Sequence, residues 1–412
     1  MEFKTVSVIG LGYIGLPTAA ILASRGLNVI GVDINVEAVE MINQGKVHIV
    51  EPDLDIVVRS AVQLNRLRAV TEPEPADAFI IAVPTPVSED HQPDTEYIRT
   101  AAMMIAPKLT KGALIILEST SPVGMTEQLA KWLAQARPDL NFPGEQDRTP
   151  DVNIAYCPER VLPGQVLQEL VSNDRLIGGL TEQCSAKATA LYETFVKGEF
   201  FPTTARTAEM AKLTENAYRD VNIAFANELS MICGNQDINV WEMIQLANRH
   251  PRVNILNPGP GVGGHCIAID PWFIVSADPD NARLIRTARE VNDNKPDYVI
   301  NKVKLAADRF KNPVIACLGL AFKADIDDLR SSPALQVVER LAELALGELL
   351  IVEPNVSELP PSLSKNGTWA ALESAVDQAD IILLLVDHKQ FKRMSMEKIH
   401  QSIVIDTRGI WI

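Results

Sequence analysis

Residues 5–33 read TVSVIGLGYIGLPTAAILASRGLNVIGVD, which is a β-rich run, a glycine turn, an apolar stretch with helical periodicity and a second β-rich run. The runs Thr5–Ile9 and Asn28–Val32 predict two strands, and the stretch up to Ser24 predicts the helix between them. A strand, a helix and a second strand within about 30 residues form a β-α-β unit with parallel strands. The chain is therefore expected to begin with a doubly wound α/β sheet.

The glycine turn carries the pattern GxGxxG at Gly10, Gly12 and Gly15. The first glycine permits a tight turn, the second lets the backbone approach a pyrophosphate, and the third lets the helix pack on the strand. Asp33 ends the second predicted strand, where a carboxylate accepts hydrogen bonds from ribose hydroxyls and repels a 2′-phosphate. This context predicts NAD rather than NADP, with a glycine turn that binds no ligand as the alternative. The cofactor-binding residues predicted here are Gly10, Gly12, Tyr13, Ile14, Gly15 and Asp33.

Alternating strand and helix patterns continue along the chain and predict its organisation. Strands are expected at Ala78–Val83, Ala113–Leu117 and Val152–Ala155, with helices at Thr95–Ala106 and Thr126–Ala136. One long helix is predicted from Ala205 to Asn235, more helix over Ala282–Phe310, and a second α/β series from Pro313. The fold class is thus α/β, with two Rossmann-like doubly wound parallel-sheet domains joined by a helical middle. The expected boundaries are 1–204, 205–311 and 312–412.

Composition and charge limit the possible functions. The net charge of −15 argues against nucleic acid or an anionic membrane as the main partner. No apolar run approaches ~20 residues, and the N-terminus lacks the features of a signal peptide, so we expect a cytoplasmic protein without a membrane span. The cysteines form no CxxC pair, which suggests neither a zinc site nor a disulfide framework. They are Cys157, Cys184, Cys233, Cys266 and Cys317.

Threonines follow two strand ends near the expected ligand crevice. Thr85 follows the strand at Ala78–Val83, and Thr120 and Thr126 follow the strand at Ala113–Leu117. Their hydroxyls are candidates for contact with cofactor or substrate. Helix capping is the alternative, because threonine also serves well there.

The segment GVGGHCIAID, residues 261–270, predicts a reactive thiol. Three glycines before Cys266 let a substrate approach the backbone closely. An ordinary thiol has a pKa of ~8.5 and needs activation to act as a nucleophile. Asp270 lies one helical turn away if a helix starts at the cysteine, where it can orient a water or accept a proton. A buried, inert cysteine is the alternative, and we expect the other four cysteines to be of that kind.

Five ordered segments resemble the UDP-sugar 6-dehydrogenases, also called the UDP-glucose/GDP-mannose dehydrogenase family. They are GLGYIG (10–15), YCPER (156–160), AEMAKLTENAYRD (208–220), GVGGHC (261–266) followed by Asp270, and GLAFKADIDDLRSSPA (319–334). The resemblance implies a double oxidation at C6 of a nucleotide sugar with two NAD. It covers the chain almost end to end.

The resemblance also implies catalytic roles. Cys266 would trap the C6 aldehyde as a thiohemiacetal, and a second oxidation would give a thioester that water hydrolyses. Lys212 and Asn216, four apart on the long helix, would stabilise the oxyanion and hold a water. Glu159 and Asp270 are the candidate carboxylates for water activation, with Thr120 assisting, and the choice between them stays open.

Substrate contacts are implied at basic and neighbouring residues, because guanidinium groups suit diphosphate oxygens. Arg330 would contact the cofactor, as would Thr85 and Thr126. His250 and Arg252 would reach a neighbouring protomer's site, which implies a homodimer. The full set of implied substrate-binding residues is Arg160, Val161, Lys212, Asn216, Arg219, His250, Arg252, Gly263, Phe322, Lys323 and Arg408.

The cysteine motif departs from the glucose-type members of the family. Those carry Pro-Lys just before the aspartate, where this chain has Ala268 and Ile269. The pattern HCIAIDP, with CPERVLPG and HPRVNI, is similar to members that oxidise UDP-N-acetyl-D-mannosamine to supply aminouronic acid for surface polysaccharide such as enterobacterial common antigen. UDP-N-acetylglucosamine and UDP-glucose remain alternatives. Two further rivals are a single-oxidation hydroxyacid dehydrogenase and a non-catalytic NAD-binding scaffold.

Overall fold

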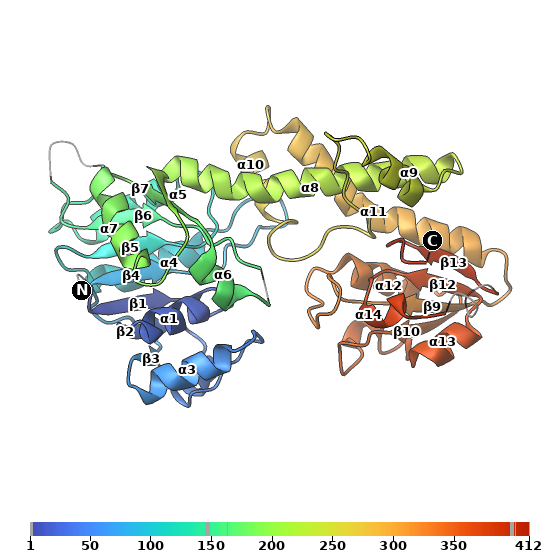
Figure 1. The fold of residues 1–412 in the computed structure, drawn as a ribbon, viewed down its shortest axis with the longest axis horizontal. Coiled ribbons are helices and arrows are strands. Elements are labelled where there is room, and N and C mark those ends of the chain that lie inside the picture. The colour runs from blue at the N-terminus through green and yellow to red at the C-terminus, as the bar shows by residue number, and fades with distance from the viewer. Residues whose placement is uncertain (1–2, 145–148, 163, 396–398, 400, 412) are drawn as a thin grey trace. The chain divides into compact units, whose positions relative to one another are not determined.

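The computed structural model describes residues 3–144, 149–162, 164–395, 399 and 401–411. The chain divides into two units, one formed by Met1–Glu215 and Trp272–Ala277 and the other by Asn216–Pro271 and Asp278–Ile412. Each unit contains one β-sheet, and Figure 1 labels their elements. The predicted fold class, two Rossmann-like sheets and a helical middle with one long helix, is confirmed.

The first sheet has eight strands in the order β3-β2-β1-β4-β5-β6-β7-β8. The order of its first six strands is that of a dinucleotide-binding sheet, with the switch point between β1 and β4. In chain order the strands are β1 (Thr5–Ile9), β2 (Asn28–Val32), β3 (Leu67–Val70), β4 (Ala78–Ile81), β5 (Leu114–Leu117), β6 (Asn153–Tyr156), β7 (Arg175–Gly179) and β8 (Phe200–Thr204).

Helices cover both faces of this sheet, because its central strands are apolar on both sides. One apolar cluster joins one face of the sheet to α1 (Gly15–Ser24), α3 (Leu54–Gln63) and α7 (Glu182–Tyr192). A second joins the other face to α4 (Glu96–Ile105) and α5 (Met125–Ala136). The shorter elements are α2 (Val36–Asn43), α6 (Val166–Ser172) and the 3₁₀ turn Ala106–Lys108.

The far edge of the first sheet departs from the expected parallel pattern. β7 pairs antiparallel with β6, and β8 then pairs parallel with β7. In the described part of the connection from β6 to β7 the one regular element is the short helix α6, and β7 then runs back along β6. The sequence patterns had not singled out β3, β7 or β8 as strands.

Helix α8 (Ala205–Asn235) is the predicted long helix, with the predicted bounds. It contains no proline, and its one glycine, Gly234, is the next-to-last residue. At 1.5 Å per residue it is about 45 Å long. Its first part belongs to the first unit and its remainder to the second.

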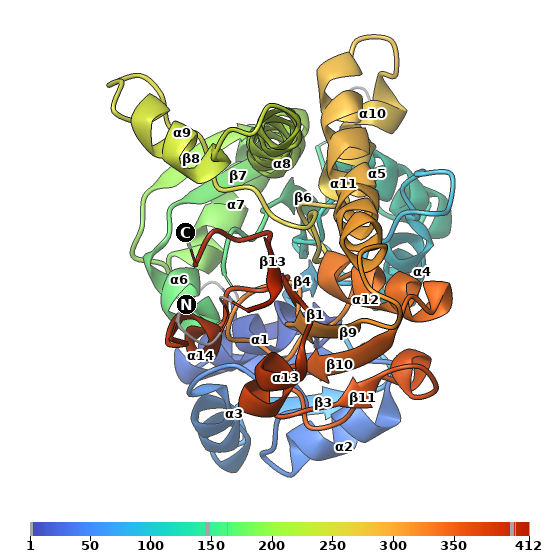
Figure 2. The same cartoon turned by 90° about the vertical axis from the view of Figure 1, so that its right-hand side faces the viewer.

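The second sheet has five strands in the order β11-β10-β9-β12-β13, all parallel. Helices α11 (Arg283–Ala307) and α12 (Pro333–Leu344) cover one face and lie side by side (Figure 1 and Figure 2). Helix α13 (Leu372–Gln378) packs on the other face. The strands are β9 (Val314–Leu318), β10 (Glu348–Val352), β11 (Thr368–Trp369), β12 (Ile381–Leu384) and β13 (Ile403–Asp406).

The remaining elements are α9 (Val240–Ala247), α10 (Asp270–Ala277), α14 (Lys389–Lys392) and the 3₁₀ turn Pro361–Leu363. The predicted strands and helices match the observed elements to within a few residues at each end. Among the described residues, no helix combines the length and the apolarity that crossing a bilayer requires.

Candidate active site

The turn between β1 and α1 gives its three glycines different tasks. Gly10 has φ +90°, and a Cβ there would lie 2.6 Å from the carbonyl oxygen of Ala82. A Cβ on Gly15 would lie 1.8 Å from the carbonyl oxygen of Gly10. A Cβ on Gly12 would meet no atom within 4 Å. The first and third glycines therefore permit packing, while the second faces open space that a ligand can enter.

Asp33 is held beside this turn by backbone hydrogen bonds. Its carboxylate accepts from the N–H of Leu11 at 2.9 Å and from the N–H of Asn35 at 2.9 Å. Ile14 immediately precedes α1 and supplies no side-chain cap, and Tyr13 beside it is exposed. A helix N-terminus, an open glycine and a fixed carboxylate fit the pyrophosphate and ribose of NAD.

The three candidate threonines have different surroundings. Thr85 donates to the carbonyl oxygen of Thr120 at 2.7 Å, so the loops after β4 and β5 lie together. Thr126 is buried in the first turn of α5 and donates to Glu209 at 2.6 Å. Glu209 also accepts from the N–H groups of Gly124 and Thr126. A side chain of α8 therefore caps the N-terminus of α5. Burial raises the pKa of Glu209, and these hydrogen bonds oppose the rise.

Glu159 lies in a buried ion pair. Its carboxylate bonds the guanidinium of Arg175, and both side chains are almost fully buried. The same guanidinium lies 4.8 Å from the ring centre of Tyr192, whose hydroxyl donates to Glu118 at 2.6 Å. Burial raises the pKa of Glu118, while Arg175 and Tyr192 lower it in part. This cluster fixes the segment after β6.

Arg160 follows Glu159 in the same segment and is partly exposed. It bonds Glu215 at 3.0 Å and the carbonyl oxygen of Asp174. Val161 beside it is half-buried. The side chain of Glu215, the ion-pair partner of Arg160, is itself exposed to water.

Cys266 is exposed, whereas the other four cysteines are buried as predicted. The N–H groups of Ile269 and Asp270 donate to the carbonyl oxygen of Cys266 at 3.0 and 2.8 Å. Cys266 thus occupies the turn that leads into α10, and regular helix begins at Asp270. Asp270 is buried and accepts from the side-chain amide of Asn216 at 2.5 Å. The structure therefore brings the glycine-rich segment 259–266, here called the thiol loop, next to the carboxylate of Asp270 and the amide of Asn216, which is 54 residues away from Asp270 in the chain.

The glycine-rich loop before Cys266 packs tightly on the second sheet's connections. A Cβ on Gly263 would lie 2.4 Å from the carbonyl oxygen of Ser331, and one on Gly264 would lie 3.2 Å from the ring of Phe322. A Cβ on Gly259 would lie 2.7 Å from Arg408. Phe322 and Arg408 therefore both lie against this glycine-rich loop.

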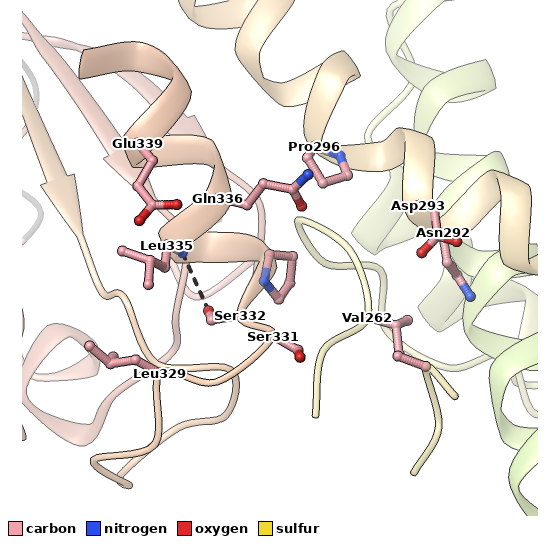
Figure 3. Close-up of a pocket in the computed structure, with 12 residues that line it drawn as sticks. Val262, Asn292, Asp293, Pro296, Leu329, Ser331, Ser332, Leu335, Gln336 and Glu339 are labelled. Atoms are coloured by element: carbon pink, nitrogen blue, oxygen red, sulfur yellow. Dashed lines mark hydrogen bonds between the residues drawn. The ribbon is translucent and has the colours of Figure 1, made fainter. Parts of the chain in front are cut away.

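A cavity of about 350 Å³ lies beside this loop. Figure 3 shows Val262 between Asn292 and Pro296 of α11 and Ser331 and Ser332 at the start of α12. Ser332 caps α12 by accepting from the N–H of Leu335 at 3.3 Å. Val262 is therefore the residue through which the thiol loop lines this cavity.

His265 and Arg330 lie close to each other beside the thiol. Burial, and then the charge of Arg330, lower the pKa of His265, so its imidazole is neutral at neutral pH. Arg330 forms a bidentate pair with Asp328, with distances of 2.9 and 2.7 Å.

Other predicted residues lie on helices and loops around these groups. Lys212 is half-buried on α8, one turn before Asn216. Arg219 and Lys323 are exposed. His250 and Arg252 are exposed in the segment after α9, where the Nδ1 atom of His250 accepts from the N–H of Arg252 at 3.3 Å. No hydrogen bond links these two residues to the thiol loop within the described part of the chain.

Several polar residues near the candidate groups were missed from sequence. All of them are buried and take part in hydrogen bonds, and they are Glu118, Arg175, Glu209, Asp220, Asn227, Arg289 and Asn292. One signal was available, because polar residues recur at the helical spacing 289, 292, 293 on α11. That signal does not distinguish a buried polar face from a solvated one.

Three models of one protein family match consecutive parts of the chain. The NAD binding domain matches residues 4–196, the central domain 206–294 and the UDP binding domain 316–412. The chain belongs to the UDP-glucose/GDP-mannose dehydrogenase family. It is accordingly an NAD-dependent dehydrogenase, which sets aside the hydroxyacid dehydrogenase and the non-catalytic scaffold.

Family relatives are similar over the full chain. An NDP-N-acetyl-D-galactosaminuronic acid dehydrogenase from Ralstonia nicotianae is 63% identical, over 100% of this chain and 97% of the relative. A UDP-N-acetyl-D-mannosamine dehydrogenase from Yersinia pestis is 62% identical, over 100% of both chains. A solved UDP-D-ManNAc dehydrogenase from Pyrococcus horikoshii has a TM-score of 0.89 and 40% identity, over 99% of this chain and 96% of that one.

Proposed function

We propose that this protein oxidises the C6 alcohol of UDP-N-acetyl-D-mannosamine to a carboxylate in two NAD-dependent steps, through a covalent bond to Cys266. The observation that carries the proposal is the exposed Cys266 in a glycine-rich loop, one helical turn from the buried Asp270. Membership of the family supports NAD and a nucleotide sugar. The names of relatives such as the Yersinia pestis enzyme support the mannosamine sugar.

A second candidate substrate is UDP-N-acetyl-D-galactosamine. The relative from Ralstonia nicotianae, at 63% identity, carries the name of a galactosaminuronic acid dehydrogenase. The two sugars share the N-acetyl group and the C6 alcohol, so the same thiol chemistry serves either. Ala268 and Ile269 before Asp270 favour an N-acetylated sugar over UDP-glucose.

The proposed chemistry assigns the thiol a trapping role. NAD, when bound, accepts a hydride from C6 in each of the two oxidations. After the first oxidation, the sulfur of Cys266 adds to the C6 aldehyde, and the thiol proton passes to the carbonyl oxygen to give a thiohemiacetal. The second oxidation converts this to a thioester, and water then releases the carboxylate and restores the thiol. Covalent attachment prevents the aldehyde from escaping.

Asp270 is the better placed of the two candidate carboxylates for orienting that water. Its carboxylate lies at the start of α10, beside the turn of Cys266, and bonds Asn216. Glu159 is instead paired with the buried Arg175, which leaves it a supporting role in this proposal. Lys212, one turn before Asn216 on α8, would stabilise the developing oxyanion, with Thr120 assisting.

Substrate and cofactor contacts are proposed for the remaining residues. Phe322 and Arg408, which already pack against the thiol loop, would form part of the nucleotide-sugar pocket. Guanidinium and ammonium groups would neutralise the diphosphate, while Arg330, Thr85 and Thr126 would serve the cofactor. The residues proposed for the nucleotide sugar are Arg160, Val161, Arg219, His250, Arg252, Gly263, Phe322, Lys323 and Arg408.

We also propose a homodimer through α8. Tyr218, Phe225 and Ile232 follow one another at intervals of seven, so they line one face of the helix, and all three are exposed. Leu246 of α9 adds a fourth exposed apolar side chain, 66% accessible. Such surfaces mark protein interfaces when they are contiguous. We further propose that the enzyme acts in the cytoplasm, where thiols stay reduced, and supplies aminouronic acid for surface polysaccharide such as enterobacterial common antigen.

The main test offers the purified protein four sugars and counts products. UDP-ManNAc, UDP-GalNAc, UDP-GlcNAc and UDP-glucose are compared by kcat/KM and by NADH released per sugar consumed. We expect the mannosamine substrate to lead, with two NADH per sugar. Cys266→Ser should bind NAD with wild-type affinity and form no acid. Normal acid formation by this variant would rule out the covalent mechanism.

A complementation experiment tests the shared site. Cys266→Ser and Arg252→Ala are each expected to be inactive as purified homodimers. If Arg252 acts on the partner's site, a co-expressed mixture regains activity, because the hybrid dimer contains one site with both residues intact. A mixture as inactive as its components would place Arg252 in its own subunit's site or outside any site.

A further inference from the structure

A chain of buried polar side chains connects α11 to the thiol loop through α8. Asp220 and Asn227 of α8 and Arg289 and Asn292 of α11 are each 0–1% exposed. Buried polar groups lower stability unless they are hydrogen-bonded, and apolar residues would pack two helices together with a smaller desolvation penalty. The presence of four such residues between α8 and α11 suggests a role that apolar packing would not fulfil.

The hydrogen bonds of this network end on the backbone of the thiol loop. Asn227 accepts from the N–H of Gly259 at 2.9 Å and donates to the side-chain oxygen of Asn292 at 2.8 Å. Asn292 in turn donates to the carboxylate of Asp220 at 2.8 Å, and Arg289 bonds the same oxygen at 2.5 Å. Burial raises the pKa of Asp220 to about 6, with Arg289 opposing the rise, so the arginine helps to keep this anchor ionised at neutral pH.

The loop also lies against the main chain of α11. Pro296 has no N–H, so it cannot bond the carbonyl of Asn292 as the helix pattern would require. A Cβ on Gly261 would lie 3.4 Å from that carbonyl oxygen and 2.8 Å from Pro333. At Gly261 the loop is therefore in close contact with both α11 and the start of α12.

Two asparagines of α8 hold the two ends of the segment that carries the thiol. Asn216 bonds Asp270 on one side of Cys266, and Asn227 bonds Gly259 on the other. They are eleven residues apart, which is about three turns and ~16 Å of helix, so they share one face of α8. A rigid helix thus fixes the distance between the two ends of the loop.

We infer that Asn227, supported by Asn292, is a positioning residue that holds Cys266 where it can capture the aldehyde. The inference rests on the proposed function, because it concerns the second half of that reaction. The first oxidation needs no sulfur, so a misplaced thiol allows the aldehyde to form and then to leave. Loss of Asn227 should therefore change the ratio of products and not only the rate.

The test compares Asn227→Ala with Asn43→Ala. Asn43 is the control for loss of an asparagine that ties two chain segments together, because its side-chain amide makes two hydrogen bonds of 2.8 Å with the backbone of Ala69, far along the chain from the thiol loop; it is exposed, whereas Asn227 is buried. Hydroxylamine traps any free aldehyde as an oxime, while NADH and sugar consumption are counted. We expect N227A to yield trapped aldehyde and a ratio falling from two NADH per sugar towards one. N43A should keep two, whatever it loses in stability.

A second variant and a second measurement keep the result decisive. N227D keeps an acceptor for the N–H of Gly259, and we expect it to restore the ratio although its buried charge lowers the Tm. If N227A fails to fold, Asn292→Ala should leak aldehyde to a smaller extent. Two NADH per sugar in every folded variant, with no oxime, would overturn the inference.

Alkylation separates failure of the inference from failure of the proposed function. With NAD but no sugar, iodoacetamide should modify Cys266 at a rate several-fold different in N227A from that in the wild type or N43A, because a loop released at Gly259 no longer holds the sulfur in one environment. If the wild type oxidises none of the sugars, the proposed function fails while alkylation still tests the positioning. Equal alkylation rates in all three proteins would count against Asn227 in either case.

Discussion

In both sheets, a glycine with positive φ follows the central strand and bonds the neighbouring strand. Gly10 follows β1 with φ +90° and donates to the carbonyl oxygen of Val32 at 2.8 Å. Gly319 follows β9 with φ +95° and donates to the carbonyl oxygen of Val352 at 2.8 Å. An acidic residue follows each of these valines and accepts from the turn, Asp33 in the first sheet and Glu353 in the second.

The two turns then diverge. After Gly10 the chain reaches the start of α1 at Gly15, whereas after Gly319 it forms a long connection before α12 starts at Pro333. Gly12 faces open space, while the matching Ala321 is buried. Only the first turn therefore presents a helix N-terminus and an accessible backbone to a pyrophosphate.

The acidic residues of the two turns, Asp33 and Glu353, also differ in how accessible they are to a ligand. Asp33 is half-buried, and its carboxylate accepts from the backbone N–H groups of Leu11 and Asn35. Glu353 is 2% exposed and bonds the buried His388 at 3.0 Å. The carboxylate of Glu353 is therefore enclosed by protein and is not accessible to a ribose. The long connection after Gly319 instead supplies Phe322, Ser331 and Pro333 to the thiol loop.

The largest expected effect comes from closing the first turn. Gly15→Val would drive a side chain into the carbonyl of Gly10, which lies 1.8 Å from the Cβ position. Strain of this kind costs several kcal/mol, and we expect NAD affinity to fall by at least ~100-fold. Calorimetric titration and the NAD-dependent rise in Tm measure it. NAD binding at wild-type affinity would break the assignment of the cofactor to this turn.

The second prediction concerns the loop that the other turn supports. A Cβ on Gly263 would lie 2.4 Å from the carbonyl oxygen of Ser331 and 2.7 Å from Pro333. Gly263→Ala should displace the thiol loop and lower the rate of acid formation by ~100-fold, because small misplacements of a reacting group are costly. NAD affinity should be unchanged, since Gly263 lies outside the first sheet. A variant that loses both functions equally would contradict the division of tasks between the turns.

The first turn could be predicted from sequence because its signal is local. Three glycines at fixed spacing, a preceding strand and Asp33 after the next strand lie within one short segment. Helix α8 was equally predictable, because no proline interrupts the segment from Ala205 to Asn235. Cys266 was predicted to be the reactive thiol from its neighbouring glycines together with the family resemblance.

The second turn and the buried networks could not be predicted in this way. Nothing in the spacing of Glu353 and His388 shows that they bond, since they are far apart in the chain and meet only through the strand order of the sheet. Glu159 was predicted as a candidate carboxylate for water activation, but its ion pair with Arg175 was not predicted, because Arg175 lies on β7, a strand that the pattern did not reveal. Contacts of this kind depend on which strands become neighbours.

The third prediction tests the open space at Gly12. Gly12→Ala adds a methyl group that meets no protein atom, so the Tm without NAD should stay within ~1 °C of the wild type. If the pyrophosphate approaches this position, the Kd for NAD should rise by ~10-fold. An unchanged Kd would show that the cofactor does not come close to Gly12.

The smallest effect is expected at the acidic residue of the second turn. In Glu353→Gln an NH₂ group replaces one of the two carboxylate oxygens. Either the oxygen that accepts from the N–H of Asn355 is replaced, or the oxygen that bonds His388 is replaced, so at least one hydrogen bond is lost. We expect a loss of about 1 kcal/mol at pH 7 and no change in NAD affinity. Chemical unfolding and NAD titration of both proteins measure these quantities.

The pH dependence of that loss tests its cause. Burial alone would raise the pKa of Glu353, but hydrogen bonds from His388 and from the N–H of Leu320 bring it below the ordinary value of 4.5. A carboxylate with a lowered pKa in the folded state contributes stability that is present above pH 4.5 and is lost as the pH falls through the folded pKa. The difference between wild type and E353Q should therefore be constant near neutrality and shrink below pH 4.5. A difference independent of pH would mean that the ionised carboxylate does not stabilise this turn, and the acid would then be a packing residue with no likeness to Asp33.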